Sequence, residues 1–395
     1  MMNNVRLSES VYYVGAVDWN LRDFHGYTTP RGVTYNSYLI IDEKVCLIDT
    51  VKAPFAQELL ERVSQIIDPA KIDYIITNHI EPDHSSALPA VMARAPQAKV
   101  LLTEHGRTGI IKHYQQNYDF QVVKEGDVLD LGRNKLQFVP VPMLHWPDSM
   151  ISYLTGEQVL FSNDAFGQHI STTKRFDEEN DIDQVLFEAE KYYANILWPF
   201  GKMVVKAVDK LKELPIKIVA PSHGVVWRKH IPDIVGKYQD WGRGKTTGKV
   251  IIAYDSMWGS TERMARQILE GVAAAGVTGR LYKMSTADRS EVVRDMLEAG
   301  GLLIGSSTLN NGMLPNMGAL MTYLKGLRPT GKIGAAFGAY GWGGGAQNAI
   351  EEMLKSSGVA VEQPGVSLKW VPDDAELNKC FEFGREFANK VLAKI

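Results

Sequence analysis

The sequence of 395 residues contains only two cysteines, Cys46 and Cys380, which lie far apart in the chain. Two thiols cannot build a disulfide scaffold, a cysteine-rich iron–sulfur cluster or a four-cysteine iron site of the rubredoxin type. We expect both cysteines to be buried free thiols, because an isolated cysteine behaves as a small apolar side chain. The scarcity of cysteine thus excludes these three classes of site.

The sequence also lacks a strong charge of one sign and a long apolar run. The formal net charge is −3 and the isoelectric point is near 6.3, which gives no sign of a nucleic-acid partner or a membrane surface. No apolar run is long enough to span a bilayer, and the first residues lack the apolar core of a signal peptide. With 45% hydrophobic and 23% charged residues, the sequence predicts a soluble protein of two to three domains, cytoplasmic by default.

Residues 1–248 show runs of strands with helices between the runs, and no regular strand–helix alternation. Strand patterns occur at 11–17, 38–42, 45–49, 73–77, 100–102, 120–123, 136–141, 150–154, 158–162 and 216–220. Helical spacing covers 54–67 and 182–214, the latter with a break near Pro199. This order predicts an α/β or α+β domain in which two sheets are flanked by helices.

A loop rich in metal ligands follows the predicted strand 73–77. Within six residues it presents two imidazoles and two carboxylates, from His79, Glu81, Asp83 and His84. Functional groups often lie where a buried strand ends, and a polar surface turn is a poor explanation for four such residues together. These side chains could hold a pair of first-row metal ions.

Three later strand ends carry further candidates. They are His145 in the stretch Met143–Asp148, Asp164 after the strand 158–162, and His223 after the strand 216–220. A single histidine after a strand is more often a hydrogen-bonded loop residue than a ligand. Together with the loop at 79–84, however, the three form a series with a consistent order and context.

The complete series resembles the ligand pattern of the metallo-β-lactamase superfamily, and therefore implies an αββα sandwich for residues 1–248. That pattern reads His-x-His-x-Asp-His, followed by a distant His, an Asp and a final His. Here Glu81 stands where the zinc hydrolases of the superfamily carry a histidine. Glutamate at this place marks the flavodiiron proteins (A-type flavoproteins), because an extra hard oxygen ligand favours iron over the nitrogen-rich sites typical of zinc.

The resemblance to flavodiiron proteins implies a role for each ligand. The residues implied for one iron are His79, Glu81 and His145, and those for the other are Asp83, His223 and, as a possible further ligand, His84. Asp164 would bridge the two irons. His25 and Tyr193 lie in stretches that also look like flavodiiron sequence, and they would line the iron site and donate a hydrogen bond or proton. Packing is an equally good explanation for Tyr193.

The tract 240–249 is rich in glycine, lysine and threonine and contains Gly244-Lys245-Thr246. A phosphate-binding loop would need a glycine five residues before Gly244, where Gln239 stands, and it would follow a strand rather than precede one. We interpret the tract as the linker between two domains.

Residues 249–395 alternate regularly between strands and helices. The predicted strands are 250–254, 279–284, 301–305, 332–337 and 366–370, and the predicted helices are 262–275, 288–299, 316–326, 344–357 and 373–393. Such alternation with buried apolar strands predicts a doubly wound parallel sheet, and five strands fit the flavodoxin order.

Three loops at strand ends of this second domain predict an FMN site. The loop after the first strand can surround a phosphate with backbone N–H groups and hydroxyls, and resembles the flavodoxin phosphate loop although Trp258 replaces its middle threonine. Trp342 is a candidate to lie against the flavin ring. The predicted flavin-binding residues are Ser256, Met257, Trp258, Gly259, Ser260, Thr261, Ser307, Thr308, Leu309, Asn310, Asn311, Gly312, Ala339, Tyr340, Gly341, Trp342 and Gly343.

Taken over the whole chain, the resemblance implies a flavodiiron oxidoreductase. FMN would receive electrons from a small carrier, rubredoxin by preference, and the diiron site would reduce O2 to water, NO to N2O, or both. The family arrangement implies a head-to-tail homodimer, or a dimer of such dimers, in which one flavin faces the other subunit's irons. Two alternatives stay open: a dizinc hydrolase fused to a flavodoxin domain, and a flavin electron carrier whose first domain is not catalytic.

Overall fold

The computed structural model describes residues 5–394. Residues 1–4 and 395, at the outer ends of the two predicted domains, lie outside the described residues. The chain folds into two compact units. The first unit extends to Tyr192 and resumes over Lys202–Gln239, and the second combines Tyr193–Gly201 with Asp240–Ile395. The boundary between residues 248 and 249 stays a prediction.

The first unit contains two large sheets. The seven-stranded sheet has the order β1 (Val5–Arg6), β2 (Val11–Tyr13), β7 (Tyr38–Ile41), β8 (Val45–Ile48), β9 (Tyr74–Ile76), β10 (Lys99–Leu102) and β11 (Phe120–Val122). The five-stranded sheet has the order β12 (Val128–Asp130), β13 (Lys135–Pro140), β14 (Met150–Leu154), β15 (Val159–Asn163) and β16 (Ile218–Pro221). Two short ribbons pair β3 (Ala16–Asp18) with β6 (Val33–Tyr35), and β4 (Asp23–Phe24) with β5 (Tyr27–Thr28).

One apolar core lies between these two sheets. Ile40, Cys46 and Ile76 from the first sheet belong to the same buried cluster as Phe138 and Phe161 from the second. Strands β8, β14, β15 and β16 are buried along their whole length. Near-continuous apolar strands are expected where both faces of a sheet are covered.

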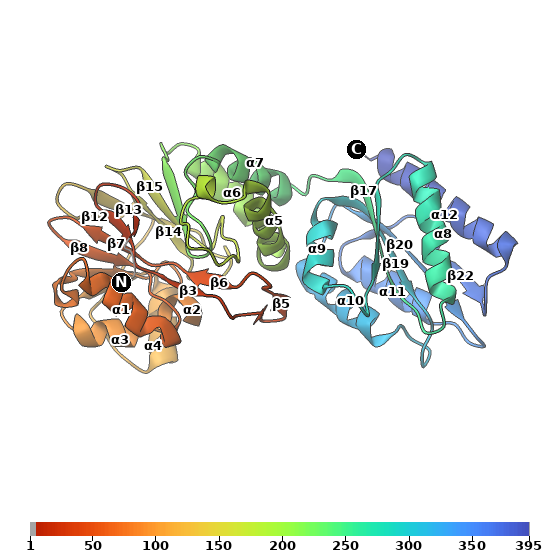
Figure 1. Cartoon of the computed structure of the whole chain (residues 1–395), viewed down its shortest axis with the longest axis horizontal. Helices are drawn as coiled ribbons and strands as arrows, with labels where there is room; N and C mark the ends of the chain where they lie inside the picture. Colours follow the sequence, from red (N-terminus) through yellow and green to blue (C-terminus); the bar gives the residue numbers. More distant parts are fainter. Residues whose placement is uncertain (1–4, 395) are drawn as a thin grey trace. The chain divides into compact units, whose positions relative to one another are not determined.

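Helices provide this cover on the outer faces, which completes an αββα sandwich (Figure 1). The seven-stranded sheet is accompanied by α1 (Ala56–Ser64), α2 (Pro82–Ser85), α3 (Leu88–Arg94) and α4 (Glu104–Tyr114), and the five-stranded sheet by α5 (Ile182–Tyr192), α6 (Gly201–Leu211) and α7 (Ile231–Gly242). A second core cluster joins the first sheet to α1 and α3 through Leu59, Val63 and Val91. The predicted αββα sandwich is therefore confirmed as the fold of the first unit.

Several predicted elements differ in detail from the structure. The strand predicted at 11–17 is divided into β2 and β3 near Gly15, where a Cβ atom would lie 2.3 Å from the Tyr35 carbonyl oxygen. The helix predicted at 182–214 is interrupted by a π-helical turn at Tyr193–Leu197 and a 3₁₀ turn at Trp198–Phe200 that contains Pro199. Helices α3, α4 and α7 were not predicted. The linker prediction of 240–249 is wrong at both ends, because α7 continues to Gly242 and the next strand begins at Thr247.

The second unit contains a parallel sheet whose order is β18, β17, β19, β20, β21, with β22 also paired to β20. Its strands are β17 (Thr247–Asp255), β18 (Gly279–Lys283), β19 (Ala299–Ser306), β20 (Ile333–Tyr340), β21 (Ala360–Val361) and β22 (Val366–Lys369). Its helices are α8 (Ser260–Ala274), α9 (Arg289–Leu297), α10 (Pro315–Leu327), α11 (Ala346–Ser356) and α12 (Asp374–Leu392). This is the flavodoxin strand order, as predicted.

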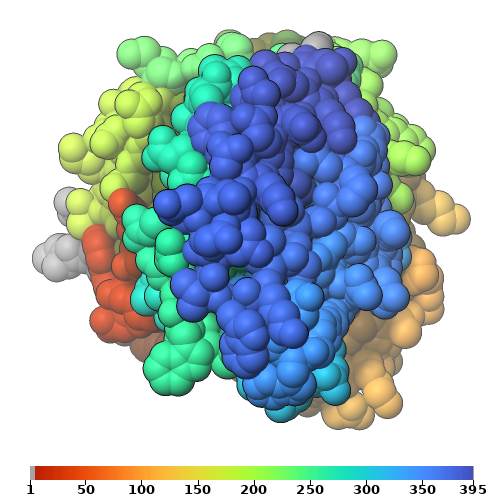
Figure 2. Space-filling view, turned by 90° about the vertical axis from the view of Figure 1, so that its right-hand side faces the viewer, coloured from red at the N-terminus to blue at the C-terminus, as the bar shows by residue number. Residues whose placement is uncertain are grey.

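Helices cover both faces of the parallel sheet. Ile268 of α8 and Phe387 of α12 share a buried cluster with Val250, Leu303 and Ile333 of the strands. Figure 2 shows α12 in dark blue beside α8 in teal on the surface of this face, and α9 and α10 lie on the other side of the sheet in Figure 1. Nowhere in residues 5–394 is a helix both long enough and apolar enough to cross a membrane.

Candidate metal centre and flavin pocket

The loop that carries the first ligands is fixed where β9 ends between the two sheets. The backbone N–H of Asn78 donates to Asp49 Oδ1 at 2.7 Å, and its side-chain amide donates to Asp49 Oδ2 at 3.1 Å. The side-chain carbonyl of Asn78 accepts from Ser152 Oγ of the facing sheet at 2.6 Å. Asn78 therefore ties the loop to both sheets immediately before His79.

The end of the loop forms the short helix α2, which the sequence did not predict. Pro82 begins this turn, and proline suits a first helical position because its missing N–H would have no partner there. The carbonyl oxygen of His84 accepts two hydrogen bonds from Thr50, from the backbone N–H at 2.8 Å and from Oγ1 at 2.7 Å. Both ends of the ligand loop are thus held in place.

Four of the predicted ligands form one group. The ligand atoms of His79, Glu81, His145 and Asp164 all lie within 4.8 Å of one another. Glu81 Oε2 is 3.4 Å from Nε2 of His79 and 3.4 Å from Nε2 of His145. Asp164 Oδ2 is 3.7 Å and 3.3 Å from the same two nitrogens.

The other three predicted ligands, Asp83, His84 and His223, form a second group with the same 4.8 Å limit. His223 Nε2 lies 3.2 Å from Asp83 Oδ2, and His84 Nε2 lies 3.6 Å from Asp83 Oδ1. The second carboxylate oxygen of Asp164, Oδ1, lies 3.1 Å from His84 Nε2 and 3.5 Å from His223 Nε2. One aspartate therefore presents one oxygen to each group, and His84 points into the site.

These separations suit metal ions. Ligand atoms bound at about 2.1 Å around a tetrahedral or octahedral ion lie roughly 3.0–3.4 Å apart. Within residues 5–394, the carboxylate oxygens of Asp83 and Asp164 are buried and receive no hydrogen bond of normal geometry, although four imidazoles face them. Buried carboxylates of this kind are stabilised by pairing with a cation or by binding a metal. The residues present therefore fit two metal ions that share Asp164.

The charges in the site lead to the same conclusion. Burial opposes protonation of His79, but hydrogen bonds with Asp148 and Glu81 outweigh it and raise the pKa of His79 to about 10. At His145 and His84, too, burial lowers the pKa and the surrounding carboxylates raise it. The carboxylates outweigh burial, so the pKa is raised to about 10 for His145 and to about 9 for His84. Without metal, these imidazoles hold protons at neutral pH. Metal ions would compete for the same nitrogen lone pairs and release those protons.

Hydrogen bonds behind the ligands orient them. Asp148 accepts from His79 Nδ1 at 3.0 Å and from the backbone N–H of Ile80 at 2.8 Å. His223 Nδ1 donates to the carbonyl oxygen of Thr34 at 2.6 Å. Each bond places the proton on Nδ1 and leaves Nε2 free to face the metal position, as is usual for metal-binding histidines.

The structure separates the two residues predicted to line this site. His25 lies at the tip of the β4–β5 ribbon, with its largely exposed side chain turned so that Nε2 is 3.5 Å from Glu81 Oε1. The ring of Tyr193 instead lies 5.1 Å from that of Trp241, within the second unit. Its neighbour Tyr192 reaches the ligands instead, with its ring 6.0 Å from that of His223.

The sequence analysis missed one further residue, His169. This histidine is buried, and its ring lies 4.9 Å from that of His223 and 5.0 Å from that of Tyr192. Burial, and then the nearby His223, keep its pKa well below the ordinary value, so the ring stays neutral. No strand end or ligand spacing points to His169, because it follows Asp164 through an irregular turn.

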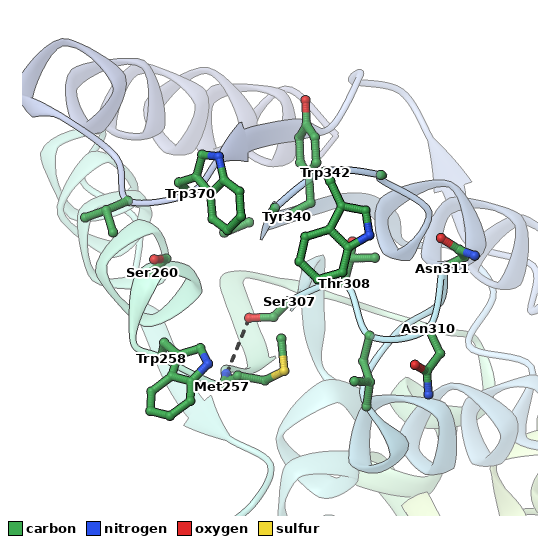
Figure 3. A pocket seen from close by; sticks show the side chains of 15 residues that line it. Met257, Trp258, Ser260, Ser307, Thr308, Asn310, Asn311, Tyr340, Trp342 and Trp370 are labelled. Carbon is green, nitrogen blue, oxygen red and sulfur yellow. Dashed lines mark hydrogen bonds between the residues drawn. The ribbon is translucent and has the colours of Figure 1, made fainter.

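The second unit contains a cavity of about 600 Å³ formed by three predicted loops. Of the predicted flavin residues, those that line it are Met257, Trp258, Ser260, Ser307, Thr308, Leu309, Asn310, Asn311, Ala339, Tyr340, Gly341, Trp342 and Gly343. Figure 3 shows their side chains around the open space, with Trp370 facing them from a fourth loop. Trp370 and Val371 were not predicted to belong to this site.

The cavity fits a flat aromatic ligand with a phosphate. Trp258 and Trp342 expose 93% and 88% of their surface at its rim, although large apolar rings are seldom so exposed without a function. The predicted residues Ser256, Gly259, Thr261 and Gly312 do not line the cavity, but three of them shape it. Ser256 Oγ accepts from the N–H of Gly259 at 3.1 Å, and Thr261 Oγ1 lies 3.0 Å from Ser307 Oγ. These bonds fix the loop at the N-terminus of α8, where phosphate binding is favourable.

Comparison with known proteins agrees with both units. Residues 33–224 match the family model described as ODP family beta lactamase, and residues 252–384 match that described as flavodoxin. The chain is 46% identical to a nitric oxide reductase of Moorella thermoacetica over 99% of this chain and 100% of that protein.

Two solved structures have the same fold along nearly the whole chain. Rubredoxin oxygen:oxidoreductase from Desulfovibrio gigas matches with a TM-score of 0.97 and 39% identity over 99% of each chain. The flavodiiron protein of Giardia intestinalis matches with a TM-score of 0.97 and 34% identity over 100% of this chain and 98% of that chain. Because relatives of 34–46% identity match along nearly the whole chain, this chain belongs to the flavodiiron protein family.

Proposed function

We propose that this chain is an oxidoreductase that reduces O2 to water, NO to N2O, or both, at two non-haem irons that receive electrons through FMN. The observation that carries the proposal is the pair of ligand groups joined by Asp164, in which Glu81 supplies a carboxylate to one group. An oxygen-rich donor set suits iron better than zinc. The names of the similar proteins, nitric oxide reductase and rubredoxin oxygen:oxidoreductase, support the same two gases.

Each side chain of the cluster has a proposed role. His79, Glu81 and His145 hold one iron, and Asp83, His84 and His223 hold the other, with Asp164 bridging. We include His84 because its Nε2 faces Asp164 Oδ1 at 3.1 Å and its backbone is fixed by Thr50. The carboxylates of Glu81, Asp83 and Asp164 add negative charge, which stabilises the higher oxidation state of the metals. When bound, the two irons and FMN supply the redox chemistry, which the protein alone lacks.

Reduction of either gas also consumes protons, and two groups are placed to supply them. His25 lies 3.5 Å from Glu81 and is open to solvent, so it can exchange protons with water. The donor role predicted for Tyr193 fits its neighbour Tyr192 better. Burial, and then Asp164, raise the pKa of Tyr192 well above its ordinary value, so its hydroxyl stays protonated and able to donate a hydrogen bond.

The electron path and the assembly are also part of the proposal. The flavin cavity belongs to the second unit and the metal ligands belong to the first, so electrons must pass from one unit to the other. A head-to-tail homodimer, or a dimer of dimers, would bring one subunit's flavin to the other's irons. A rubredoxin-type carrier in the cytoplasm would reduce FMN. The two domains of the chain would be residues 1–248 and 249–395.

The test is metal analysis of anaerobically purified protein, followed by stopped-flow reoxidation of the reduced enzyme with O2 and with NO. We expect two irons and one FMN per chain and rapid reoxidation by at least one gas. Asp164→Ala should lose iron and gas consumption, whereas His113→Ala, at an exposed histidine outside the cluster, should change neither. Two zinc ions without iron would indicate the dizinc hydrolase. Unchanged gas consumption in Asp164→Ala would indicate a flavin carrier with a non-catalytic first domain.

A further inference from the structure

A separate apolar pocket lies in the first unit, between α6, α7 and the sheet strands β15 and β16. Its volume is about 190 Å³, and its walls are carbon side chains that include Leu160, Val208, Val219 and Val235. The one charged residue at its edge is Lys212, whose ammonium group donates to Asp209 Oδ1 at 3.2 Å. The walls of the pocket are therefore mostly apolar.

Phe166 connects this pocket to the metal centre. It lines the pocket and follows the bridging ligand Asp164 by two residues. Its backbone is held on both sides, because the N–H donates to Tyr238 Oη at 2.7 Å and the carbonyl accepts from Trp227 Nε1 at 2.8 Å. The ring packs 4.5 Å from that of Tyr238. With the backbone fixed, rotation of the ring is the motion left to this residue.

The residue after Phe166 adjoins the ligands. A Cβ atom placed on Gly167 would lie 3.6 Å from His223 Cβ, 3.5 Å from Tyr192 Cζ and 2.9 Å from the carbonyl oxygen of Asp164. The pocket and the metal ligands are therefore on opposite sides of the turn Asp164–Gly167. The ring of Phe166 lines the pocket on the side of that turn.

We infer that this pocket is a binding site for small apolar gases, and that it supplies O2 or NO to the metal centre past the ring of Phe166. The inference rests on the proposed function, since it concerns the route of that reaction's substrates. Enclosed apolar cavities of about this size bind apolar ligands such as xenon. This pocket is open to solvent on the side of the exposed residues Lys212 and Pro232, where a dissolved gas can enter. Another cavity of the first unit is less suited to this task, because Lys202, Lys206, Lys210 and Glu125 line it beside its apolar residues.

Xenon is the probe for the site. Crystals of the full chain with its metals and FMN would be pressurised with xenon, and we expect a xenon atom among Val208, Val235 and Phe166. The variant Val235→Phe should fill the pocket and remove the xenon. The matched control is Val205→Phe, which adds the same volume at a partly buried position of α6 that does not line the pocket. Should Val235→Phe fail to fold, Val235→Met fills the pocket less severely.

Kinetics complete the test. In Val235→Phe the second-order rate constant for reoxidation by the gas should fall severalfold while the rate of FMN reduction by the donor is unchanged, and Val205→Phe should match the wild type. Absence of xenon from the pocket, or an unchanged gas rate constant in Val235→Phe, would overturn the inference. Xenon occupancy does not depend on turnover, so a protein that binds xenon here but consumes neither gas would contradict the proposed function instead.

Discussion

Replacing Asp148 by asparagine should weaken metal binding at His79 although Asp148 itself touches no metal position. The carboxylate accepts two hydrogen bonds, from His79 Nδ1 at 3.0 Å and from the Ile80 N–H at 2.8 Å, and the side chain is almost fully buried. An asparagine offers one accepting oxygen and one donating NH2 group in the same space. Both bonds end on the same oxygen, Oδ2, so asparagine keeps them only when its amide oxygen takes that place, and a neutral acceptor then replaces a charged one. Hydrogen bonds to charged groups contribute about 1.5–3 kcal/mol against about 1 kcal/mol for neutral ones, so the loss is about 1 kcal/mol.

The cost takes one of two forms. If the amide oxygen takes the place of Oδ2, both bonds remain, but the ring loses the negative charge that makes it a stronger ligand. If the NH2 group takes that place, both N–H groups lose their partner, and the ring must accept at Nδ1 and carry its proton on Nε2, which then cannot bind a metal. Either way we expect metal affinity to fall by about 10- to 100-fold, the usual effect of removing a partner behind a metal-binding histidine.

The assay is iron content against increasing chelator, with the flavin content measured in the same samples. Asp148→Asn should release iron at a lower chelator concentration and keep its FMN. The control is Asp130→Asn, at an exposed aspartate that accepts a single loop hydrogen bond from Gly132 at 2.9 Å. Iron retention in Asp148→Asn equal to that of the wild type would refute the reasoning that Asp148 sets the tautomer and position of His79.

Three further predictions concern separate features. Glu81→His should raise the bound zinc-to-iron ratio, measured by metal analysis after growth in mixed metals, and should abolish gas reduction, because a third imidazole makes the first group nitrogen-rich. Trp342→Ala should weaken FMN binding by about 1 kcal/mol or more, roughly fivefold in Kd by fluorescence titration, through loss of ring stacking. Burial lowers the pKa of Lys332 to about 7, so between about pH 7 and 10 the unfolded chain binds a proton that the folded chain does not. Stability should therefore rise with pH across that window in chemical denaturation, and Lys332→Met should lose the rise.

Much of the site could be predicted because its ligands follow strands. His79, Asp164 and His223 each come within three residues of the end of an apolar strand, and Asp164 and His223 follow the neighbouring parallel strands β15 and β16. The resemblance to flavodiiron proteins at Glu81 then indicated iron, and the hard oxygen ligand that Glu81 adds agrees with it. The flavin loops were predicted for the same reason, because regular strand–helix alternation places the carboxyl ends of parallel strands together.

The residues that were missed have no such local signal. His169 and Trp370 reach their sites through irregular backbone, and Trp370 even adopts a left-handed conformation with φ of 62°. The resemblance to flavodiiron sequence implies Tyr193 at the site, whereas the structure brings Tyr192 to the ligands. A π-helical turn begins at Tyr193, and no sequence pattern shows on which face of the helix each of the two side chains lies there. The predicted linker overlaps the last turn of α7, because Trp241-Gly242 interrupts the helical pattern of the sequence there.

The π-helical turn has a consequence for dissecting the protein into fragments. Residues Tyr193–Gly201 come from the first half of the sequence but group with the second unit. Asn195 is hydrogen-bonded there to Ser290 and Tyr323. The side-chain nitrogen of Lys332 lies 5.4 Å from the centre of the Trp198 ring. A recombinant fragment that starts at residue 249 would lack the segment 193–201 of its own unit. A fragment that ends at residue 248 would contain this segment but not the residues of the second unit against which it packs. Expression of the flavodoxin-like half alone should therefore succeed better when a peptide spanning 193–201 is supplied in trans.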